Sequence, residues 1–265
     1  MTEAVRFAER QLADAGVDTP RVDAELLLAH VFGVSRSGVH ALDEREVPGT
    51  FHVLLGRRLK REPLAYVLGE WGFRRLTLKT DTRALVPRPE TEIVVERCLE
   101  LLRDERAPRV LDLGTGTGAI ALAIADEHPG ARVTAVDSSP GAVALARENA
   151  ERLGLQVEVR PAGFGVAAEG WDLVVSNPPY VRPEEWGSLQ PEIREWEPRG
   201  ALVGVGLHEE IARIARTRRL VLEVGDGQAR CVADALTSLG YADVTVTKDL
   251  AGTERVVEGH DRRGG

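Results

Sequence analysis

From Arg109 onward the chain alternates short apolar runs with longer amphipathic ones, and this alternation constrains the fold more than any other feature. Short apolar runs bounded by turn residues are typical of buried strands, whereas apolar residues at helical spacing predict helices. Strands are expected at residues 110–113, 131–136, 156–160, 171–175, 219–224, 241–247 and 254–259. Helices are expected at residues 117–127, 139–153, 207–217 and 228–239. This order predicts an open α/β sheet with helices on both faces, closed by two strands that fit an antiparallel edge.

Residues 2–62 have a different pattern, which predicts short helices and no strands. One expected helix begins at Pro20 and ends at Gly33, and another covers residues 49–60. Short helices with short connections form small bundles. The basic cluster at residues 57–61 is either a contact surface for an anionic partner or a helix end whose positive charges suit the helix dipole.

A stiff segment is expected to join the two parts. Leu76 and Leu78 alternate with polar residues, which predicts an exposed strand or one arm of a hairpin. The expected domains are therefore a helical domain at residues 1–68, a hairpin linker at 69–86 and an α/β domain at 87–265.

Composition and charge restrict the kind of protein. Of the 265 residues, 43% are hydrophobic and 29% are charged, as in an ordinary globular protein. Residues 1–75 carry 11 basic and 11 acidic side chains, so the net charge of −8 falls on the remainder. This negative net charge disfavours extensive non-specific binding to nucleic acid, because such binding requires a basic surface. We therefore expect no stable nucleic-acid binding, and no membrane span, because no apolar run reaches about 18 residues.

The cysteines and the first residues indicate a cytoplasmic protein. Cys98 and Cys231 lie far apart and in no metal-ligand spacing. Neither a disulfide framework nor a metal site is expected, and reduced thiols suit the cytoplasm. The first 16 residues are charged throughout and lack the apolar stretch of a signal peptide.

The run Asp112-Leu113-Gly114-Thr115-Gly116-Thr117-Gly118 lies where the first strand of the α/β part turns into its helix. Glycines at this place allow a tight turn and let a ligand lie against the backbone beside a helix N-terminus. The spacing G-x-G-x-G differs from the G-x-G-x-x-G dinucleotide fingerprint. Asp112 would repel a phosphate but could hold an ammonium group, directly or through water.

The second strand of this part ends at Asp137, where a carboxylate can accept both hydroxyls of a ribose. An ammonium site, a ribose site and a glycine-rich turn against which a ligand can lie together fit S-adenosylmethionine better than NAD. The loop at residues 161–165 should contact the adenine, and Phe164 could cover that ring by stacking. The candidate cofactor-binding residues are Asp112, Gly114, Thr115, Gly116, Thr117, Gly118, Asp137, Phe164 and Asn177.

Ser176-Asn177-Pro178-Pro179-Tyr180 follows a buried strand and is the expected place of the chemistry. An asparagine side chain offers an acceptor and a donor, and prolines stiffen the turn and leave its carbonyls free to accept. With the ring of Tyr180, the segment could hold a flat group that carries an NH2. A plain strand-ending turn is the alternative interpretation.

Together these motifs resemble the release factor glutamine methyltransferases, the HemK or PrmC family. The resemblance rests on Pro63–Gly69, Pro87–Glu92, Asp112–Gly118, Asp137, Asn177–Tyr180, Glu197–Arg199 with Ala201 and Leu202, Leu222–Gly225, and Asp249–Gly252 with Arg255. The run Pro87-Arg88-Pro89-Glu90-Thr91-Glu92 is the most specific of these, whereas Asn-Pro-Pro-Tyr is shared with adenine and guanine methyltransferases. Two stretches depart from the family, because the loop before Trp171 lacks the polar-aromatic residues usual at the adenine site and residues 202–207 lack an acid.

The resemblance implies a seven-stranded, Rossmann-like class-I methyltransferase domain that depends on S-adenosylmethionine. It also implies a hairpin linker and a small helical N-terminal domain that contacts the substrate protein. The implied reaction is methylation of the glutamine side-chain amide in the Gly-Gly-Gln tripeptide of class-1 peptide chain release factors, which would modulate translation termination.

The expected mechanism is orientation of the substrate amide by hydrogen bonds. The side-chain oxygen of Asn177 and the carbonyl of Pro178 each accept one amide N–H, and Tyr180 flanks the amide plane. The candidate catalytic residues are Asn177, Pro178 and Tyr180, and Pro179 joins them in the candidate substrate site. Two alternatives stay open: a glutamine in another translation protein such as a ribosomal protein, and a flipped adenine in nucleic acid. A dinucleotide-dependent oxidoreductase is disfavoured by the glycine spacing.

Overall fold

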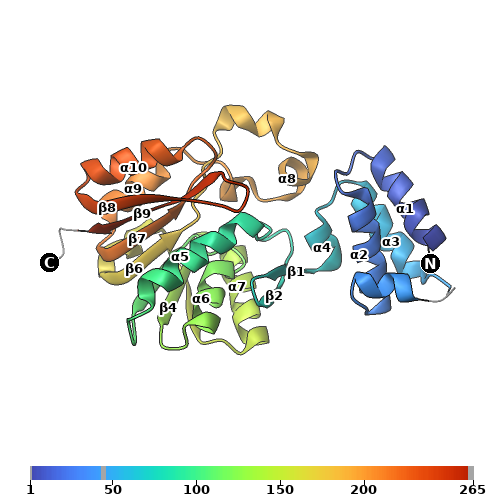
Figure 1. Ribbon diagram of the computed structural model, residues 1–265, viewed down its shortest axis with the longest axis horizontal. Coiled ribbons are helices and arrows are strands. Elements are labelled where there is room, and N and C mark those ends of the chain that lie inside the picture. The colour runs from blue at the N-terminus through green and yellow to red at the C-terminus, as the bar shows by residue number, and fades with distance from the viewer. Residues whose placement is uncertain (1, 43–45, 262–265) are drawn as a thin grey trace. The chain divides into compact units, whose positions relative to one another are not determined.

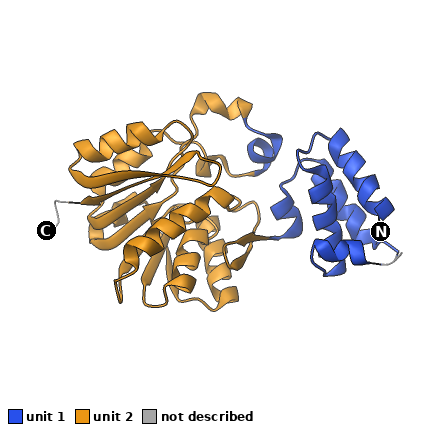
Figure 2. Cartoon of the chain, viewed as in Figure 1, with its two compact units in different colours: residues 1–70, 189–196 blue, residues 71–188, 197–265 orange. Residues whose placement is uncertain are grey.

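The structure, a computed structural model, describes residues 2–42 and 46–261 (Figure 1). The chain divides into two compact units, which Figure 2 colours separately. One comprises residues 1–70 and 189–196, and the other comprises residues 71–188 and 197–265. In the described ranges, no helix has both the length and the apolar character that a membrane span requires.

The first unit is a bundle of short helices, as its sequence predicts. Its helices are α1 (Thr2–Asp14), α2 (Pro20–Phe32), the 3-10 helix η1 (Ser37–Ala41), α3 (Gly49–Leu59), α4 (Leu64–Leu68) and α8 (Pro191–Trp196). Gly33 ends α2 in the left-handed conformation, with φ of 64°. The bundle is held by fully buried side chains from different helices, among them Leu12, Leu27 and Phe51. The helices α4 and α8 were not predicted, because each is too short to show a helical period.

Carboxylates of the first unit hold most of the basic cluster at residues 57–61. Arg58 is 6% exposed and donates to Asp23 and to Glu192, at 2.7 and 2.9 Å. Arg61 donates to both carboxylate oxygens of Glu192 at 2.6 Å each. Arg57 pairs with Glu62. These ion pairs fix the helix α8, which lies far along the chain, within the first unit.

The second unit contains a seven-stranded sheet with the order β5-β4-β3-β6-β7-β9-β8. Its strands are β3 (Arg109–Leu113), β4 (Arg132–Asp137), β5 (Val157–Pro161), β6 (Trp171–Ser176), β7 (Thr217–Glu223), β8 (Tyr241–Lys248) and β9 (Glu254–Asp261). The strands from β5 to β7 are parallel, whereas β9 runs antiparallel to both β7 and β8. The antiparallel edge that the sequence predicts is therefore confirmed. A separate hairpin pairs β1 (Glu70–Phe73) with β2 (Leu76–Lys79), also as expected.

Helices cover both faces of this sheet (Figure 1). One face packs against α5 (Glu92–Leu102), α6 (Ala119–Glu127) and α7 (Pro140–Leu153). The other face packs against α9 (Leu207–Ile214) and α10 (Ala229–Ser238). Consecutive residues of β3 enter opposite cores, because Val110 faces the first set of helices and Leu111 the second.

Small differences from the predicted boundaries have local causes. The helix expected from residue 117 begins at Ala119, because Gly118 adopts a φ of 88°. The helix expected to reach residue 217 ends at Ile214, because Thr217 already belongs to β7. Three short 3-10 helices were not predicted, because their few turns carry no clear period: η3 (Phe164–Glu169), η4 (Pro183–Ser188) and η5 (Arg199–Ala201). A fourth, η2 (Pro89–Thr91), directly precedes α5, where a helix start was expected at Glu90 and Glu92.

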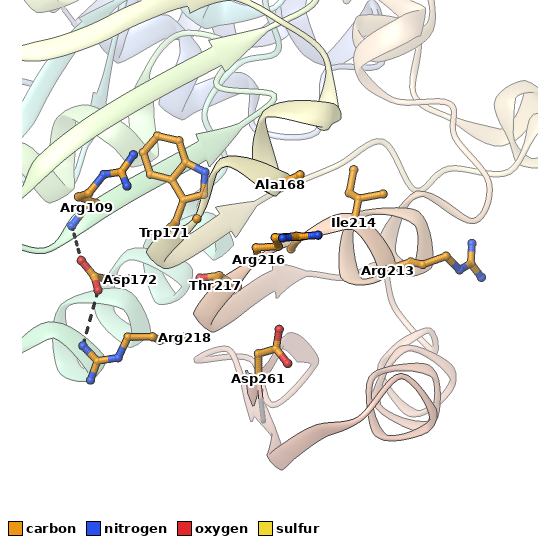
Figure 3. Close-up of a pocket in the computed structure, with 12 residues that line it drawn as sticks. Arg109, Ala168, Trp171, Asp172, Arg213, Ile214, Arg216, Thr217, Arg218 and Asp261 are labelled. Atoms are coloured by element: carbon orange, nitrogen blue, oxygen red, sulfur yellow. Dashed lines mark hydrogen bonds and ion pairs between the residues drawn. The ribbon is translucent and has the colours of Figure 1, made fainter. Parts of the chain in front are cut away.

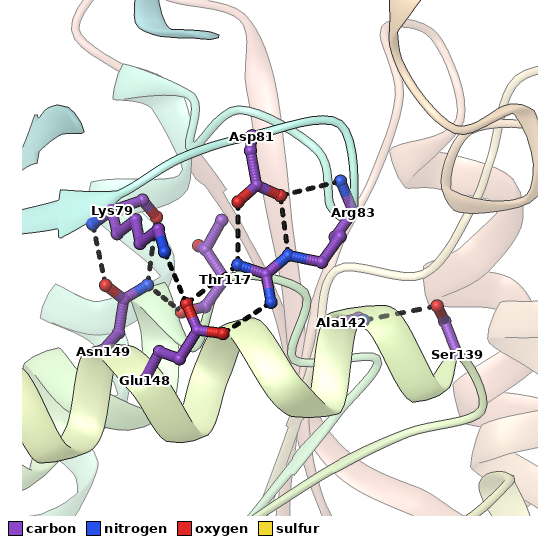
Figure 4. Close-up of polar contacts among 8 residues, drawn as sticks. All are labelled: Lys79, Asp81, Arg83, Thr117, Ser139, Ala142, Glu148 and Asn149. Atoms are coloured by element: carbon purple, nitrogen blue, oxygen red, sulfur yellow. Dashed lines mark hydrogen bonds and ion pairs between the residues drawn. The ribbon is translucent and has the colours of Figure 1, made fainter. Parts of the chain in front are cut away.

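Asn149 on α7 ties the hairpin strand β2 to the glycine loop (Figure 4). Its side chain is fully buried and donates to the carbonyls of Lys79 and Thr117, at 3.1 and 2.9 Å. Its oxygen accepts from the amide of Lys79 at 2.7 Å. A side chain of this kind uses both its donor and its acceptor groups to join two backbone segments that do not pair with each other.

Replacing Asn149 with alanine is expected to lower the free energy of unfolding by about 3 kcal/mol, because each buried polar group left without a partner costs roughly 1–3 kcal/mol. Urea unfolding measures this. The matched control is Glu148→Ala on the same helix, which removes partly exposed ion pairs to Lys79 and Arg83 and should cost about 1 kcal/mol or less. Equal losses in the two variants would contradict the bridging role of Asn149.

Candidate active site

A cavity of about 630 Å³ lies at the carboxyl ends of β3, β4 and β6. These strands end together, because Leu113 pairs with Val136 on one side and with Ser176 on the other. Ligands of open α/β sheets bind at this edge. The predicted site residues that line the cavity are Gly114, Thr115, Gly116, Thr117, Asp137, Phe164, Asn177 and Pro179. Asp112, Gly118, Pro178 and Tyr180 lie outside this lining.

A second cavity, of about 880 Å³, lies at the opposite edge of the sheet, where β3, β6 and β7 begin (Figure 3). Its lining includes Arg109, whose guanidinium lies 4.7 Å from the ring centre of Trp171. It contains no residue of the glycine loop and none of Asn177–Tyr180. Its Arg218 and Arg213 already pair with acidic neighbours. The first cavity is therefore the candidate active site.

The glycine loop bends sharply at the floor of the first cavity. Gly114, Gly116 and Gly118 all have positive φ, of 73°, 57° and 88°. A Cβ atom on Gly118 would lie 2.9 Å from Leu122, so the helix α6 leaves no room for a side chain there. A Cβ atom on Gly114 would meet nothing within 4 Å, since that position faces open space. The loop therefore presents bare backbone to the cavity.

Asp137 fixes the loop and keeps acceptor capacity for a ligand. Its Oδ2 accepts from the amide of Gly116 at 3.0 Å, and its Oδ1 accepts from the amide of Ser139 at 2.8 Å. A carboxylate has about four acceptor positions. Each oxygen of Asp137 can thus accept a further hydrogen bond, which suits two neighbouring hydroxyls.

Asp112 lies beneath the loop. It is 1% exposed, and its Oδ2 accepts from the hydroxyl of Thr115 at 2.6 Å and from the amide of Ala121 at 3.2 Å. Its Oδ1 is buried and has no hydrogen-bond partner among the residues that the structure describes. Burial raises the pKa of Asp112 to about 7. Contact of Asp112 with an ammonium group remains a prediction.

This raised pKa predicts a pH effect on stability. The usual pKa is 3.8 and the folded-state pKa is about 7, so the folded state binds the proton more tightly. The contribution of Asp112 to the free energy of unfolding should therefore fall as the pH rises from about 4 to 7, and it should stay constant above pH 7. In Asp112→Asn this titration is absent, so the variant should gain stability relative to the parent across the window. Urea unfolding at several pH values measures the difference, and a difference that stays constant with pH would contradict the assignment.

The segment Asn177–Tyr180 packs closely against two glycines. A Cβ atom on Gly204 would lie 2.5 Å from the Pro179 carbonyl oxygen, and one on Gly225 would lie 2.9 Å from the Tyr180 ring. The carbonyl of Tyr180 accepts from Gln228 Nε2 at 3.0 Å. By contrast, the carbonyl of Pro178 accepts no hydrogen bond from any described residue. The turn is thus held in place with one acceptor left free.

Asn177 itself lines the cavity and has one side-chain contact. Its Nδ2 donates to Thr91 Oγ1 at 3.4 Å, and its Oδ1 accepts from no described residue. Tyr180 is half-buried, and its hydroxyl lies 3.5 Å from Oε1 of Glu223. Burial and the Glu223 carboxylate raise the pKa of Tyr180. The hydroxyl therefore stays protonated, which leaves it a donor.

The structure brings together motifs that the sequence separates. Arg88 Nη2 donates to Oε2 of the buried Glu197 at 2.6 Å, which joins the Pro87–Glu92 run to the Glu197–Leu202 motif. Sequence reasoning missed Thr91 as a neighbour of Asn177 and Glu223 as a neighbour of Tyr180. The signal for Glu223 was available, because it is an acid that directly follows the apolar run Leu220-Val221-Leu222, and Thr91 belongs to the Pro87–Glu92 run on which the resemblance rests.

Family models match both parts of the chain. Residues 3–69 match the PrmC N-terminal domain, and residues 92–189 match the methyltransferase small domain. Release factor glutamine methyltransferases from three bacteria are similar over nearly the whole chain. The Caulobacter vibrioides protein is 36% identical over 98% of this chain and 96% of its own. The Cereibacter sphaeroides protein is 40% identical over 96% of both chains, and the Salmonella typhimurium protein is 40% identical over 95% of both chains.

Solved structures show the same fold at low identity. The human Mettl16 catalytic domain, solved with an RNA hairpin, has a TM-score of 0.57 and 16% identity over 80% of this chain and 82% of its own. The T. thermophilus 16S rRNA methyltransferase RsmC, solved with AdoMet and guanosine, has a TM-score of 0.53 and 19% identity over 73% of this chain and 50% of its own.

The sheet order, the cavity at its carboxyl edge and the matched domain define an S-adenosylmethionine-dependent methyltransferase. The chain belongs to the release factor glutamine methyltransferase family. The predicted family and fold class are thereby confirmed.

Proposed function

We propose that this protein transfers the methyl group of S-adenosylmethionine to the side-chain amide nitrogen of the glutamine in the Gly-Gly-Gln motif of class-1 peptide chain release factors. The observation that carries the proposal is the pair of unused acceptors beside the cofactor cavity, the Oδ1 of Asn177 and the carbonyl of Pro178. A primary amide presents two N–H donors, one for each acceptor. The names of the bacterial relatives support the same substrate.

The residues around the cavity suit S-adenosylmethionine. The bare backbone at Gly114 and Gly116 would support the cofactor, and the two oxygens of Asp137 would accept its ribose hydroxyls. Phe164 is half-buried and lines the cavity, where it would cover the adenine ring. The Oδ1 of Asp112, which has no hydrogen-bond partner among the described residues, would accept from the ammonium group and balance its positive charge, directly or through water. When bound, the cofactor supplies an electrophilic methyl group on a sulfonium.

The protein's part in the reaction is to orient a poor nucleophile, because the lone pair of an amide nitrogen is delocalised into its carbonyl. Asn177 and Pro178 would each accept one N–H and so turn the nitrogen toward the methyl group. Positioning of this kind lowers a barrier by several kcal/mol, up to roughly 7–11 in the best cases. Tyr180 does not line the cavity, and its stacking on the amide plane remains a prediction.

The remaining parts of the proposal concern the partner. The helical unit would contact the release factor, as its match to the PrmC N-terminal domain suggests. Methylation of the Gly-Gly-Gln glutamine would modulate translation termination and would place the protein in the cytoplasm. The net charge of −8 gives no support to a nucleic-acid substrate.

The test uses purified protein, isotope-labelled S-adenosylmethionine and a purified class-1 release factor. The release factor is supplied in two forms, one with the natural Gly-Gly-Gln and one with its glutamine replaced by alanine. Label is expected on the first form only, and mass spectrometry should place one methyl group on that glutamine. Equal label on both forms, or none on either, would refute the proposal.

A further inference from the structure

The first cavity has few charged groups in its lining. Among the described residues that line it, Arg83 and Arg88 are the cations and Asp137 is the anion. S-adenosylmethionine carries a carboxylate on its methionine part, besides the ammonium and sulfonium groups. A carboxylate that leaves water needs donors or a cation, because burying an unpaired charge is costly. Phe164, Asp137 and Asp112 would contact the adenine, the ribose and the ammonium group, and none of them can bind this carboxylate.

Arg83 is already held by two acidic side chains (Figure 4). Its Nε and Nη2 donate to the two carboxylate oxygens of Asp81, at 2.8 Å each. Its Nη1 and Nη2 donate to the carboxylate of Glu148, at 2.7 and 2.9 Å. These bonds use four of the five N–H groups of the guanidinium. Because two carboxylates already share its single positive charge, Arg83 is a poor partner for a third.

The backbone of the glycine loop also has few donors left. Four of the five amides at residues 114–118 already donate to acceptors within the protein, at 2.8–3.0 Å: those of Gly114, Thr115, Gly116 and Gly118. An N–H group carries one proton, so an amide engaged in this way has little to offer a ligand. The loop can therefore support the cofactor by contact, whereas the carboxylate needs donors from another segment.

Arg88 has most of its donors free. Its Nη2 donates to Oε2 of Glu197 at 2.6 Å, and its side chain makes no other hydrogen bond to a described residue. Four of its five N–H groups are thus available. The side chain of Arg88 is 25% exposed, whereas that of Glu197 is 1% exposed. The buried acid therefore holds the guanidinium on one side, and its other donors stay accessible at the cavity that Arg88 lines.

The backbone at Arg88 is stiff and lies close to Asn177. Arg88 stands between Pro87 and Pro89, and a residue before proline is restricted to an extended conformation. Arg88 has this conformation, with φ of −94° and ψ of 142°. Its carbonyl accepts from the amide of Thr91 at 3.1 Å, and Thr91 Oγ1 accepts from Asn177 Nδ2 at 3.4 Å. Arg88 thus belongs to a fixed turn beside the residue that is expected to hold the substrate amide.

We propose that Arg88 binds the carboxylate of the methionine part of S-adenosylmethionine, while Glu197 holds the guanidinium in place. A guanidinium can meet a carboxylate through two parallel N–H···O bonds, and one that is already paired on another side loses less freedom on binding. Glu197 reaches the cofactor only through Arg88 and is a positioning residue. The inference rests on the cofactor part of the proposed function and is independent of the protein substrate.

The test measures the binding of two ligands by titration calorimetry. One is S-adenosylmethionine, and the other is decarboxylated S-adenosylmethionine, which keeps the ammonium, the sulfonium and the adenosine. The parent protein should bind the decarboxylated ligand about 10- to 100-fold more weakly, the effect of losing a hydrogen bond to a charged group. Arg88→Met should weaken S-adenosylmethionine by a similar factor. Its affinity for the decarboxylated ligand should stay within about threefold of the parent's, so the two dissociation constants become nearly equal.

Arg83→Met provides the matched control, because it removes the other cation of the cavity lining. Since the acidic neighbours of Arg83 already take up its donors, the ratio of the two dissociation constants should stay within about threefold of the parent ratio. Loss of the parent ratio in Arg83→Met but not in Arg88→Met would assign the carboxylate to Arg83 and overturn the inference.

The other outcomes are equally distinct. A parent protein that binds the two ligands within about threefold of each other refutes the inference without any variant. If Arg88→Met weakens both ligands equally, Arg88 only supports the cavity wall and the inference is wrong. Should Arg88→Met not fold, Arg88→Gln, which can still donate to Glu197, replaces it with the same expectation. If the parent binds neither ligand, the cofactor of the proposed function is wrong, whereas normal binding without label on the release factor refutes only the proposed substrate.

Discussion

Asn177→Ala is expected to lower the turnover number by roughly 10³-fold or more, while the dissociation constant of S-adenosylmethionine stays within about threefold. The variant loses the Oδ1 acceptor that would orient the substrate amide, and that acceptor serves the transition state more than the cofactor. The glycine loop and Asp137, which would hold the cofactor, make no hydrogen bond to Asn177. Turnover with labelled cofactor and calorimetric titration of the cofactor measure the two quantities.

Ser188→Ala provides the matched control for Asn177→Ala. Ser188 is exposed at the end of η4, downstream of the same turn, and its hydroxyl donates to a nearby backbone carbonyl. Its replacement should leave both the turnover number and the cofactor affinity unchanged. Near-normal turnover in Asn177→Ala would disprove the orienting role, and an equal loss of cofactor affinity would reassign Asn177 to the cofactor site.

Asp137→Ala is expected to weaken S-adenosylmethionine binding by at least about 100-fold. Hydrogen bonds to charged groups contribute about 1.5–3 kcal/mol each, and two of them to the ribose would be lost. Each 1.4 kcal/mol corresponds to about tenfold in affinity. The amides of Gly116 and Ser139 would also lose their acceptor, which loosens the loop that forms the floor of the cavity. Titration calorimetry measures the affinity directly.

Two further variants sharpen this result. Asp137→Asn keeps one acceptor oxygen and should give an intermediate affinity. Asp234→Ala removes an exposed aspartate on α10 and should bind the cofactor like the parent. If saturating cofactor restores the turnover of Asp137→Ala to nearly the parent value, the defect lies in binding, as expected. An unchanged affinity in Asp137→Ala would rule out the ribose contact.

Different loops of the sheet are expected to hold the cofactor and the substrate. We expect the cofactor contacts to come from the loops after β3, β4 and β5, and the substrate acceptors to come from the turn after β6. In a parallel sheet these loops share one edge, so two separate reactants can be held side by side without sharing a residue. Variants in the two groups should accordingly affect different measured constants, cofactor affinity in one and turnover in the other.

Much of the fold could be predicted because its signals are local. The strands and helices of the second unit appear within a few residues of their predicted places, since periodicity in burial is a property of each segment alone. The glycine loop and Asp137 were predictable for the same reason, because tight turns and strand ends have their own residue types. The short helices α4 and α8 were not, because fewer than two helical turns show no period.

The sequence by itself determined the order of elements, the glycine loop, Asp137 and the turn at Asn177, because each depends on neighbours in the chain. Only the tertiary structure decided what surrounds Asn177. Thr91 lies 86 positions before it, and Glu197 lies 109 positions after Arg88. Such pairs depend on the strand order β5-β4-β3-β6-β7-β9-β8, which brings distant segments to one edge of the sheet. The buried Glu223 is a further case, since its carboxylate accepts from the hydroxyl of Tyr180, which lies 43 positions earlier in the chain.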